Sequence, residues 1–262
     1  MKIGICGLGF VGNAIYTFMK NQHEIVIYDK YKQLNTLDIL LDAEIIYLCV
    51  PTPYNDTIKT YSMDELDNTF FLLAELNYKG IILVKSTVLP DYCETMNNTY
   101  PGLHIIHNPE FLSAKTAEED FKEQKHIILG YTMQSQPHMN RIETYYKNII
   151  PASTISVTTS TASALVKLAC NSFYATKVQY FTELFLLCEK INVDFNTVKH
   201  LMLNNNWINP MHTQVPGQDG DISFGGACLP KDISALNQYM IVNKVPNRLV
   251  NSVISERNIM RE

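Results

Sequence analysis

The sequence lacks the features that mark several large classes of protein. It contains no run of about 18 consecutive apolar residues, the length that a membrane-spanning helix needs. Its net charge of −5 gives no basic surface field, so nucleic acid is not an expected partner. The opening segment MKIGICGLGF has glycines where a secretory signal would have an apolar core and a cleavage site. We therefore predict a cytoplasmic protein that binds neither membranes nor nucleic acid.

The six cysteines are spread along the chain without a Cys-x-x-Cys pair. Neither a zinc site nor a disulfide framework is indicated by this spacing, and a reducing compartment suits it. His104 and His107 form an isolated His-x-x-His in a strand-like segment. Two histidines alone are too few for a metal site, so we predict no bound metal.

Residues 1–158 alternate short β-branched runs with amphipathic stretches, a pattern that predicts a parallel sheet flanked by helices. The predicted strands are Lys2–Cys6, His23–Tyr28, Ile45–Val50, Gly80–Lys85, Leu103–His107 and His126–Leu129. Helices are predicted at Val11–Lys20 and Met63–Tyr78, and a short one from Pro90. Ser62 and Glu65 have the spacing of a capping box at the start of the second helix.

Residues 159–262 have a helical pattern throughout, so we predict a second, all-helical domain. The stretch Thr161–Glu189 predicts one long helix, and shorter helices are predicted at Phe195–Leu203, Asp232–Val242 and Arg248–Met260. The segment Asn204–Gly226 is rich in Asn, Pro and Gly, and it is long enough for a functional loop.

The segment G-L-G-F-V-G follows the first predicted strand and leads into the first predicted helix. Such glycines allow a tight turn and a close approach of backbone N–H groups to a pyrophosphate at a helix N-terminus. Asp29 ends the second predicted strand, where a carboxylate can accept the ribose hydroxyls. We therefore predict a Rossmann domain, with NAD favoured over NADP because Asp29 would repel a 2′-phosphate. The adjacent Lys30 weakens that preference.

Residues 50–53 and 86–88 follow the third and fourth predicted strands, at the carboxyl edge where such sheets bind ligands. The complete set of expected cofactor-binding residues is Gly7, Gly9, Phe10, Val11, Gly12, Asp29, Lys30, Val50, Pro51, Thr52, Ser86 and Thr87.

Cys228 differs from the other five cysteines in its neighbours. The segment FGGACLPKD places it on a glycine-rich turn just before a predicted helix. The positive end of a helix and the nearby Lys231 both favour a thiolate. We predict that Cys228 is a nucleophile and that the other cysteines are small buried apolar residues.

Five segments resemble motifs of the UDP-glucose/GDP-mannose dehydrogenase family. They are GLGFVG at residues 7–12, KSTV at 85–88, NPEFL at 108–112, KLACNSFYATK at 167–177 and FGGACLPKD at 224–232. The resemblance implies NAD-dependent oxidation of the C6 hydroxyl of a nucleotide-sugar such as UDP-glucose to the uronic acid, a step of polysaccharide biosynthesis.

The resemblance also implies roles for single residues. Cys228 would attack the sugar aldehyde to form a thiohemiacetal. Lys167 and Asn171, four residues apart on one helix face, would stabilise the oxyanion that develops. Asp232 with Glu110 and Thr87 would position or deprotonate water. The expected substrate contacts are Glu110, Phe111, Leu112, Lys167, Asn171, Phe224, Gly225 and Cys228.

Three features depart from the family's pattern. Ala114 stands where a second glutamate is usual, four residues past Glu110. The segment between Asp29 and the third predicted strand is shorter than in the family. The chain also ends where the family's central domain ends, so we expect the C-terminal nucleotide-binding domain to be missing. A partner chain or the loop over residues 204–226 could supply the substrate contacts instead.

A homodimer is predicted, because the apolar residues of Thr161–Glu189 surround the helix and require a second covering surface. The resemblance also implies dimerisation through this helix. Two other functions stay open. A one-step hydroxyacid-type dehydrogenase would use Lys167 and Asn171 alone, but it would not need Cys228. A cofactor-binding protein without catalysis would not need the intact catalytic set.

Overall fold

The computed structural model describes residues 1–113 and 115–261. The chain forms two compact units, of which unit 1 comprises Met1–Pro53 and Tyr61–Lys167, and unit 2 comprises Tyr54–Thr60 and Leu168–Glu262. The long helix α6 (Ser160–Lys190) runs from the first unit into the second. The domain boundary predicted between residues 158 and 159 falls at the end of the last strand, whereas the division into units falls inside α6.

Unit 1 is built on a seven-stranded sheet with the order β2-β1-β3-β6-β7-β8-β9. Every neighbouring pair is parallel except β7 and β8, which are antiparallel. Strand order reverses between β1 and β3, at the carboxyl edge where doubly wound sheets bind ligands. The strands are β1 (Lys2–Cys6), β2 (Glu24–Tyr28), β3 (Ile45–Leu48), β6 (Ile81–Val84), β7 (His104–His107), β8 (His126–Tyr131) and β9 (Thr154–Thr159).

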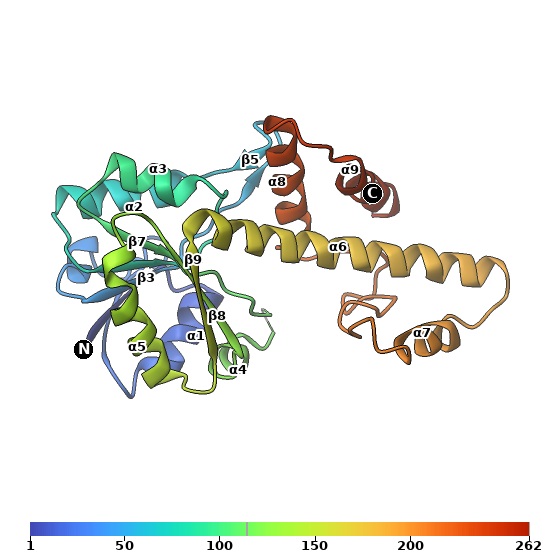
Figure 1. Cartoon of the computed structure of the whole chain (residues 1–262), viewed down its shortest axis with the longest axis horizontal. Coiled ribbons are helices and arrows are strands. Elements are labelled where there is room, and N and C mark those ends of the chain that lie inside the picture. The colour runs from blue at the N-terminus through green and yellow to red at the C-terminus, as the bar shows by residue number, and fades with distance from the viewer. Residues whose placement is uncertain (114, 262) are drawn as a thin grey trace. The chain divides into compact units, whose positions relative to one another are not determined.

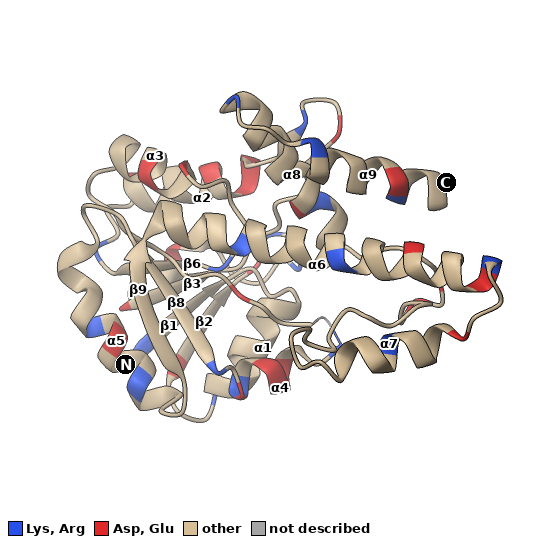
Figure 2. Cartoon of the chain, turned by 45° about the vertical axis from the view of Figure 1, so that its right-hand side comes forward, with Lys and Arg blue, Asp and Glu red and all other residues tan. Residues whose placement is uncertain are grey.

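Helices cover both faces of this sheet (Figure 1). One buried cluster packs α1 (Phe10–Met19), α4 (Ala117–Lys122) and α5 (Met139–Ile149) against one face. A second cluster packs α2 (Asp64–Glu75), α3 (Tyr92–Thr99) and the first turns of α6 against the other. Charged side chains lie mainly on the helices and loops, and the strands between them are nearly free of charge (Figure 2).

Unit 2 contains the rest of α6 together with α7 (Phe195–Leu203), α8 (Leu229–Val242) and α9 (Arg248–Met260). One cluster joins α6, α8 and α9 through Ala175, Ile233 and Val253, and a second one joins α6 and α7. A two-stranded hairpin of β4 (Tyr54–Asn55) and β5 (Thr60–Tyr61) also belongs largely to this unit. The regular elements described from residue 160 onward are all helices, as predicted, and the hairpin that joins them in this unit comes from the N-terminal half of the chain.

The long loop over residues 204–226 is fixed to its unit by polar contacts. The Arg261 guanidinium donates to the carbonyl oxygens of Ile222 at 2.6 Å and Ser223 at 2.9 Å. The Ser223 hydroxyl also donates to Gln179 on α6 at 2.5 Å. These contacts order the end of the loop directly before the FGGACLPKD segment.

The α/β class, the mostly parallel sheet and the long helix are confirmed. The bounds of α7 and α9 agree with the predicted helices, and α8 begins at Leu229, three residues before the predicted start. The predicted capping box is wrong. The residue that caps α2 is Met63, the Ser62 hydroxyl donates to Asp64, and Glu65 binds a partner far away in the sequence.

Within the residues described, no helix has both the length and the apolar character needed to cross a membrane.

Candidate active site

The glycine-rich segment lies between β1 and α1, where its geometry excludes side chains. Gly7 has a φ of +91°, and a Cβ there would lie 2.8 Å from the carbonyl oxygen of Cys49. A Cβ on Gly12 would lie 2.0 Å from the carbonyl oxygen of Gly7. No described atom lies within 4 Å of the position a Cβ of Gly9 would take. The backbone at the α1 N-terminus is therefore open to a ligand's close approach.

A cavity of about 330 Å³ opens beside this segment, lined by Phe10, Asn13 and residues 115–119. Glu118 on α4 accepts hydrogen bonds from Asn13 and Thr17 on α1, so α4 is fixed next to the glycine turn. Val11 packs against the core below the turn. An open glycine turn, a helix N-terminus and an adjacent cavity together fit a dinucleotide pyrophosphate.

Asp29 is buried at the end of β2, and both of its carboxylate oxygens are engaged. One accepts the Leu8 N–H at 2.6 Å, and the other accepts the Lys32 N–H at 2.8 Å. Each carboxylate oxygen can accept a second hydrogen bond, so ribose contacts remain compatible with this geometry. Asp29 also holds the glycine turn in place, a role the sequence pattern does not indicate.

Lys30, also expected at the cofactor, is bound by a carboxylate of α2. Its Nζ lies 2.8 Å and 3.1 Å from the two oxygens of Glu65, and the Tyr31 hydroxyl donates to the same carboxylate at 2.8 Å. These hydrogen bonds raise the pKa of Lys30 and lower that of Glu65, so both groups stay charged at neutral pH.

The segments after β3 and β6 are joined to each other at the carboxyl edge of the sheet. The Thr52 hydroxyl donates to the Thr87 carbonyl oxygen at 2.8 Å, and the Ser86 hydroxyl donates to the Val50 carbonyl oxygen at 2.6 Å. All three hydroxyl-bearing side chains are buried. The structure thus brings together the residues predicted around Pro51 with those predicted at Ser86 and Thr87.

Glu110 and Lys167 form a buried ion pair in unit 1. The Lys167 Nζ lies 3.2 Å from Glu110 Oε1 and donates to the Glu110 carbonyl oxygen at 2.5 Å. Glu110 Oε2 accepts the Leu112 N–H at 2.7 Å, and the Phe111 ring lies with its centroid 5.1 Å from the ammonium. Ala114, predicted to replace a glutamate near this turn, lies outside the described residues.

Lys85, the first residue of KSTV, is a buried neighbour that the motif analysis did not place in the site. Its Nζ donates to Asn108 Oδ1 at 3.1 Å and to the Pro109 carbonyl oxygen at 3.4 Å, just before Glu110. Desolvation lowers the pKa of Lys85 to about 8. A lysine at the end of an otherwise apolar strand is an anomaly that could have revealed this role.

His107, of the predicted strand-like His-x-x-His, faces the start of α6. Its Nδ1 lies 2.8 Å from the Ser163 hydroxyl oxygen. Burial, followed by the charges of Lys85 and Lys167, lowers the pKa of His107 to about 3. His107 is therefore neutral at physiological pH.

In unit 2, Cys228 stands at the N-terminal cap of α8, where the sequence placed it. Asp232 lies one turn further on and is completely buried. Its carboxylate accepts the Asn171 side-chain amide at 2.5 Å and lies 2.6 Å from the Lys231 Nζ. The structure thus places Asn171 beside Asp232, whereas the sequence grouped Asn171 with Lys167, and Asp232 with Glu110 and Thr87.

Phe224 and Gly225 are two other predicted substrate contacts of unit 2, and neither has an exposed side chain that could bind a substrate. The Phe224 ring is buried in the cluster that joins α6, α8 and α9. A Cβ on Gly225 would lie 2.2 Å from the Arg261 guanidinium. Any contact of these two residues with a substrate would come from their backbone.

The predicted catalytic residues therefore fall into two groups, and α6 contributes to each. Lys167 binds Glu110 in one unit, and Asn171 binds Asp232 in the other. They lie four residues apart on the same helix, so they share a helix face. Lys167 uses two of its three N–H groups on Glu110, and Asn171 uses one of its two on Asp232.

A cavity of about 570 Å³ in unit 2 overlaps the predicted site only at Phe224. It lies between the β4–β5 hairpin and helices α8 and α9, and its lining includes Lys59, Ser234 and Arg257. Cys228 and Asp232 are not among its lining residues. Residues 230, 234, 237 and 241 of α8 lie on a helix face away from Asp232.

The sequence matches two domains of one family. Residues 33–150 match the NAD binding domain of the UDP-glucose/GDP-mannose dehydrogenase family, and residues 161–258 match its central domain. The chain belongs to the UDP-glucose/GDP-mannose dehydrogenase family. The central-domain match contains Lys167, Asn171, Cys228 and Asp232, and the N-terminal match assigns NAD as the cofactor of unit 1.

Individual relatives agree with this membership. The chain is 30% identical over 227 residues to a UDP-glucose 6-dehydrogenase of Rickettsia felis, covering 82% of this chain and 48% of that protein. It thus spans about half the length of the curated relatives it matches first.

Two solved structures show the same fold. The UDP-glucose dehydrogenase of Pyrobaculum islandicum has a TM-score of 0.84 at 20% identity, covering 98% of this chain and 68% of that one. The 3-hydroxyisobutyrate dehydrogenase of Mycobacterium tuberculosis has a TM-score of 0.74 at 13% identity, covering 97% and 91%. The fold alone therefore does not distinguish a UDP-glucose dehydrogenase from a 3-hydroxyisobutyrate dehydrogenase.

Proposed function

We propose that the protein oxidises the C6 hydroxyl of a nucleotide-sugar of the UDP-glucose type to the carboxylate, with NAD as the oxidant. The observation that carries this proposal is the arrangement along α6 and α8. Lys167 is paired with Glu110, and Asn171 with Asp232, on adjacent turns of one helix. Cys228 stands one turn before Asp232 at a helix N-terminus. A one-step alcohol oxidation would not need this nucleophile.

NAD would be held by the open glycine turn and by Asp29, and each bound NAD would accept one hydride from C6, so that two NAD are used in succession. The chain's own residues handle the protons and the covalent step. Overall, one primary alcohol, two NAD and one water become one carboxylate, two NADH and three protons.

Cys228 supplies the covalent step. Its sulfur adds to the C6 aldehyde and forms a carbon–sulfur bond, and the carbonyl π electrons move to the oxygen. The N–H groups that Lys167 and Asn171 do not use on Glu110 and Asp232 are the donors for that oxygen. Such donors contribute about 3–4 kcal/mol each to transition-state stabilisation in comparable sites.

The thioester left after the second oxidation is hydrolysed by water. Asp232, Glu110 and Thr87 are the residues proposed to position that water or accept its proton. Attack of water on the thioester carbonyl breaks the carbon–sulfur bond, releases the acid and returns the Cys228 thiol.

A panel of nucleotide-sugars tests the proposal. The full chain is mixed with NAD and each candidate sugar in turn, and NADH absorbance is followed. NADH formation with at least one nucleotide-sugar, and none with free hexoses or small hydroxyacids, supports the proposal. Turnover of a small hydroxyacid such as 3-hydroxyisobutyrate instead would favour the one-step alternative.

We further propose a homodimer formed through α6 and a cytoplasmic location. Support for the dimer comes from apolar side chains that stay exposed on α6, considered below. Cys6, Cys49, Cys93, Cys170 and Cys188 form no disulfide in the part of the chain that the structure describes, which suits a reducing compartment.

A further inference from the structure

Lys30 directly follows Asp29 at the end of β2, next to the expected ribose position. In doubly wound folds a cation near this position accommodates the 2′-phosphate of NADP. Lys30 is the cation that the sequence offers there, and its side chain is 52% exposed. A free ammonium at this place would favour NADP.

The ammonium of Lys30 is not free. Both oxygens of Glu65 bind it, at 2.8 Å and 3.1 Å. Glu65 lies in the first turn of α2, 35 residues away in the sequence, and this turn also contains Asp64 and Asp67 (Figure 2). The Tyr31 hydroxyl, 2.8 Å from Glu65 Oε1, holds the carboxylate from a second side.

We propose that Glu65 is a specificity-determining residue, which excludes NADP by binding Lys30 and by adding a negative charge beside the ribose position. This inference rests on the dinucleotide-binding part of the proposed function and goes beyond it. It assigns the preference for NAD to two carboxylates, Asp29 and Glu65, which come from different elements of the fold.

Lys32 is the other cation of this turn, and its ammonium donates to the Leu8 carbonyl oxygen at 2.7 Å. Among the described residues, the carboxylates that accept hydrogen bonds from this turn are Asp29 and Glu65. Replacing Glu65 by glutamine removes one negative charge and at the same time releases the Lys30 ammonium. Both changes favour binding of the 2′-phosphate dianion of NADP. NAD has an uncharged hydroxyl at this position, so its affinity gains nothing from them.

The test is direct binding of NAD and NADP to the full chain, measured by calorimetry at low ionic strength. For Glu65→Gln, we expect NADP to bind about tenfold more tightly than to the wild type, the effect of one new charge-assisted hydrogen bond to phosphate. The affinity for NAD should change less than about threefold, because its free hydroxyl gains no such bond. A circular-dichroism melt confirms that the variant is folded.

Asp64→Asn is the matched control. It removes the same charge from the same helical turn, but Asp64 binds the Ser62 hydroxyl and not Lys30. We expect no gain in NADP affinity from it. An equal gain from both variants would mean that net charge alone sets the preference, and would overturn the role given to Lys30.

Two double variants identify the cation. Adding Lys30→Gln to Glu65→Gln should abolish the gain in NADP affinity, and adding Lys32→Gln should leave most of it. Loss of the gain with Lys32→Gln but not with Lys30→Gln would overturn this inference alone. The same holds if Glu65→Gln gains no NADP affinity while the wild type binds NAD. A wild type that binds neither dinucleotide would overturn both this inference and the proposed function.

Discussion

At the scale of single residues, Lys85 carries a charge that its surroundings stabilise poorly. Its ammonium is completely buried and is bound by an amide oxygen and a carbonyl oxygen, both neutral acceptors. Burial of a cation without a carboxylate partner costs free energy. The contacts nevertheless hold Asn108 and Pro109, the two residues before Glu110. Lys85 thus supports the turn that carries a proposed catalytic carboxylate.

Replacing Lys85 with methionine should therefore change stability in a pH-dependent way. The pKa of Lys85 is about 8 in the folded chain and near 10.5 when unfolded. The penalty of burying the charge is complete below pH 8, at about 3 kcal/mol, and disappears as the pH rises toward 10.5. The free energy of unfolding of Lys85→Met, relative to the wild type, should be higher at pH 7 than at pH 10.

Urea unfolding of both proteins at the two pH values gives this difference, with Lys79→Met as an exposed control. A change between pH 7 and pH 10 that is seen for Lys85→Met and not for the control belongs to the buried ammonium. If the free energies of unfolding of the wild type and of Lys85→Met differ by the same amount at pH 7 and at pH 10, the pKa of Lys85 is not lowered by burial.

Cys228 is the residue on which the proposed two-step chemistry depends. With Cys228→Ser, we expect formation of the acid to fall by roughly a thousandfold or more, since a serine hydroxyl without an adjacent general base is a poor nucleophile. Cys170→Ser, a neighbouring thiol on α6, should retain activity. Product analysis by mass spectrometry provides the measurement, and undiminished acid formation in Cys228→Ser would refute the covalent role.

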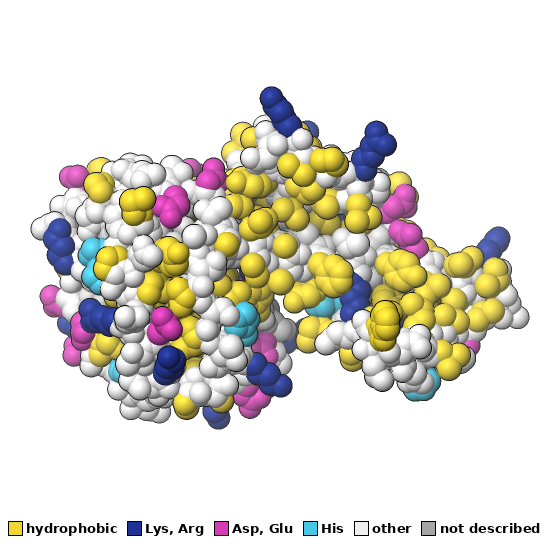
Figure 3. Space-filling view, in the orientation of Figure 1, with side chains coloured by type: hydrophobic (Ala, Val, Ile, Leu, Met, Phe, Trp, Pro, Cys, Tyr) yellow, Lys and Arg dark blue, Asp and Glu magenta, His cyan; other side chains and the backbone are white. Residues whose placement is uncertain are grey.

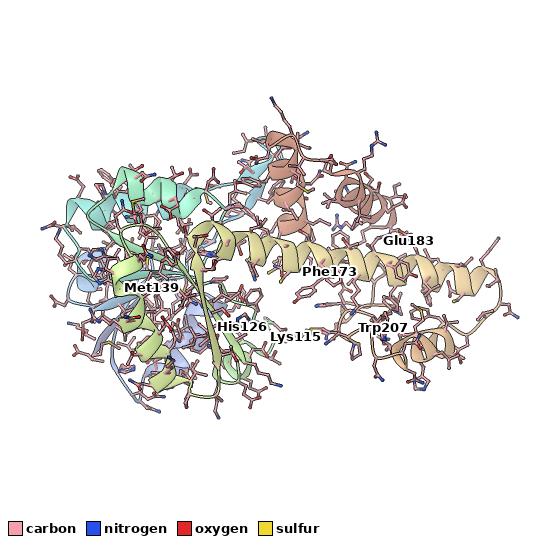
Figure 4. The ribbon with its side chains drawn as sticks, viewed as in Figure 1. Lys115, His126, Met139, Phe173, Glu183 and Trp207 are labelled. Atoms are coloured by element: carbon pink, nitrogen blue, oxygen red, sulfur yellow. The ribbon has the colours of Figure 1, made fainter. Side chains whose placement is uncertain are left out.

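At the scale of elements, α6 keeps a row of apolar side chains exposed. Val166, Phe173, Tyr180 and Leu187 are between 38% and 64% exposed, and they follow one another at seven-residue intervals. Figure 3 shows hydrophobic side chains gathered over the unit 2 part of α6, and Figure 4 marks Phe173 on that helix. A repeat of seven places these residues along one helix face, as in helix pairs that associate through a seam.

A second copy of the chain is the partner we expect on this face. Light scattering of the wild type should give twice the chain mass of 29.9 kDa, and Phe173→Asp combined with Tyr180→Asp should shift the protein to the single mass. Leu201→Asp, on α7 and equally exposed, is the control and should leave the dimer intact. A wild-type mass near 29.9 kDa at every concentration would exclude the dimer.

The helices and strands differ in how well the sequence predicts them. Buried parallel strands are short, continuous apolar runs, and α6 is a long stretch without glycine or proline, so their positions are predicted closely. Helix α4 has only six residues, too few to show a period. Helix α5 has apolar residues at positions 139, 142, 145 and 146, a helical spacing that could have identified it. The capping box fails because Glu65 forms a stronger, charge-assisted contact with Lys30 than it could with the backbone.

At the scale of the whole molecule, the motifs predict which residues carry chemistry, and the fold shows what holds them. The proposed nucleophile, lysine and asparagine can be named from sequence because their motifs are specific. Their partners cannot, since the contacts between Lys85 and Asn108, or between Lys30 and Glu65, join residues more than twenty positions apart. The division of the proposed catalytic set between two units that share α6 is likewise a property of the fold.

The central claim is a two-step oxidation through Cys228, and the yield of NADH per sugar tests it most directly. A limiting, known amount of the accepted nucleotide-sugar is incubated with excess NAD until the absorbance is constant, and the products are identified by mass spectrometry. We predict two NADH for each sugar consumed, with the uronic acid as the sole sugar product. One NADH per sugar, with an aldehyde or ketone released, would contradict the account and establish the one-step reaction instead.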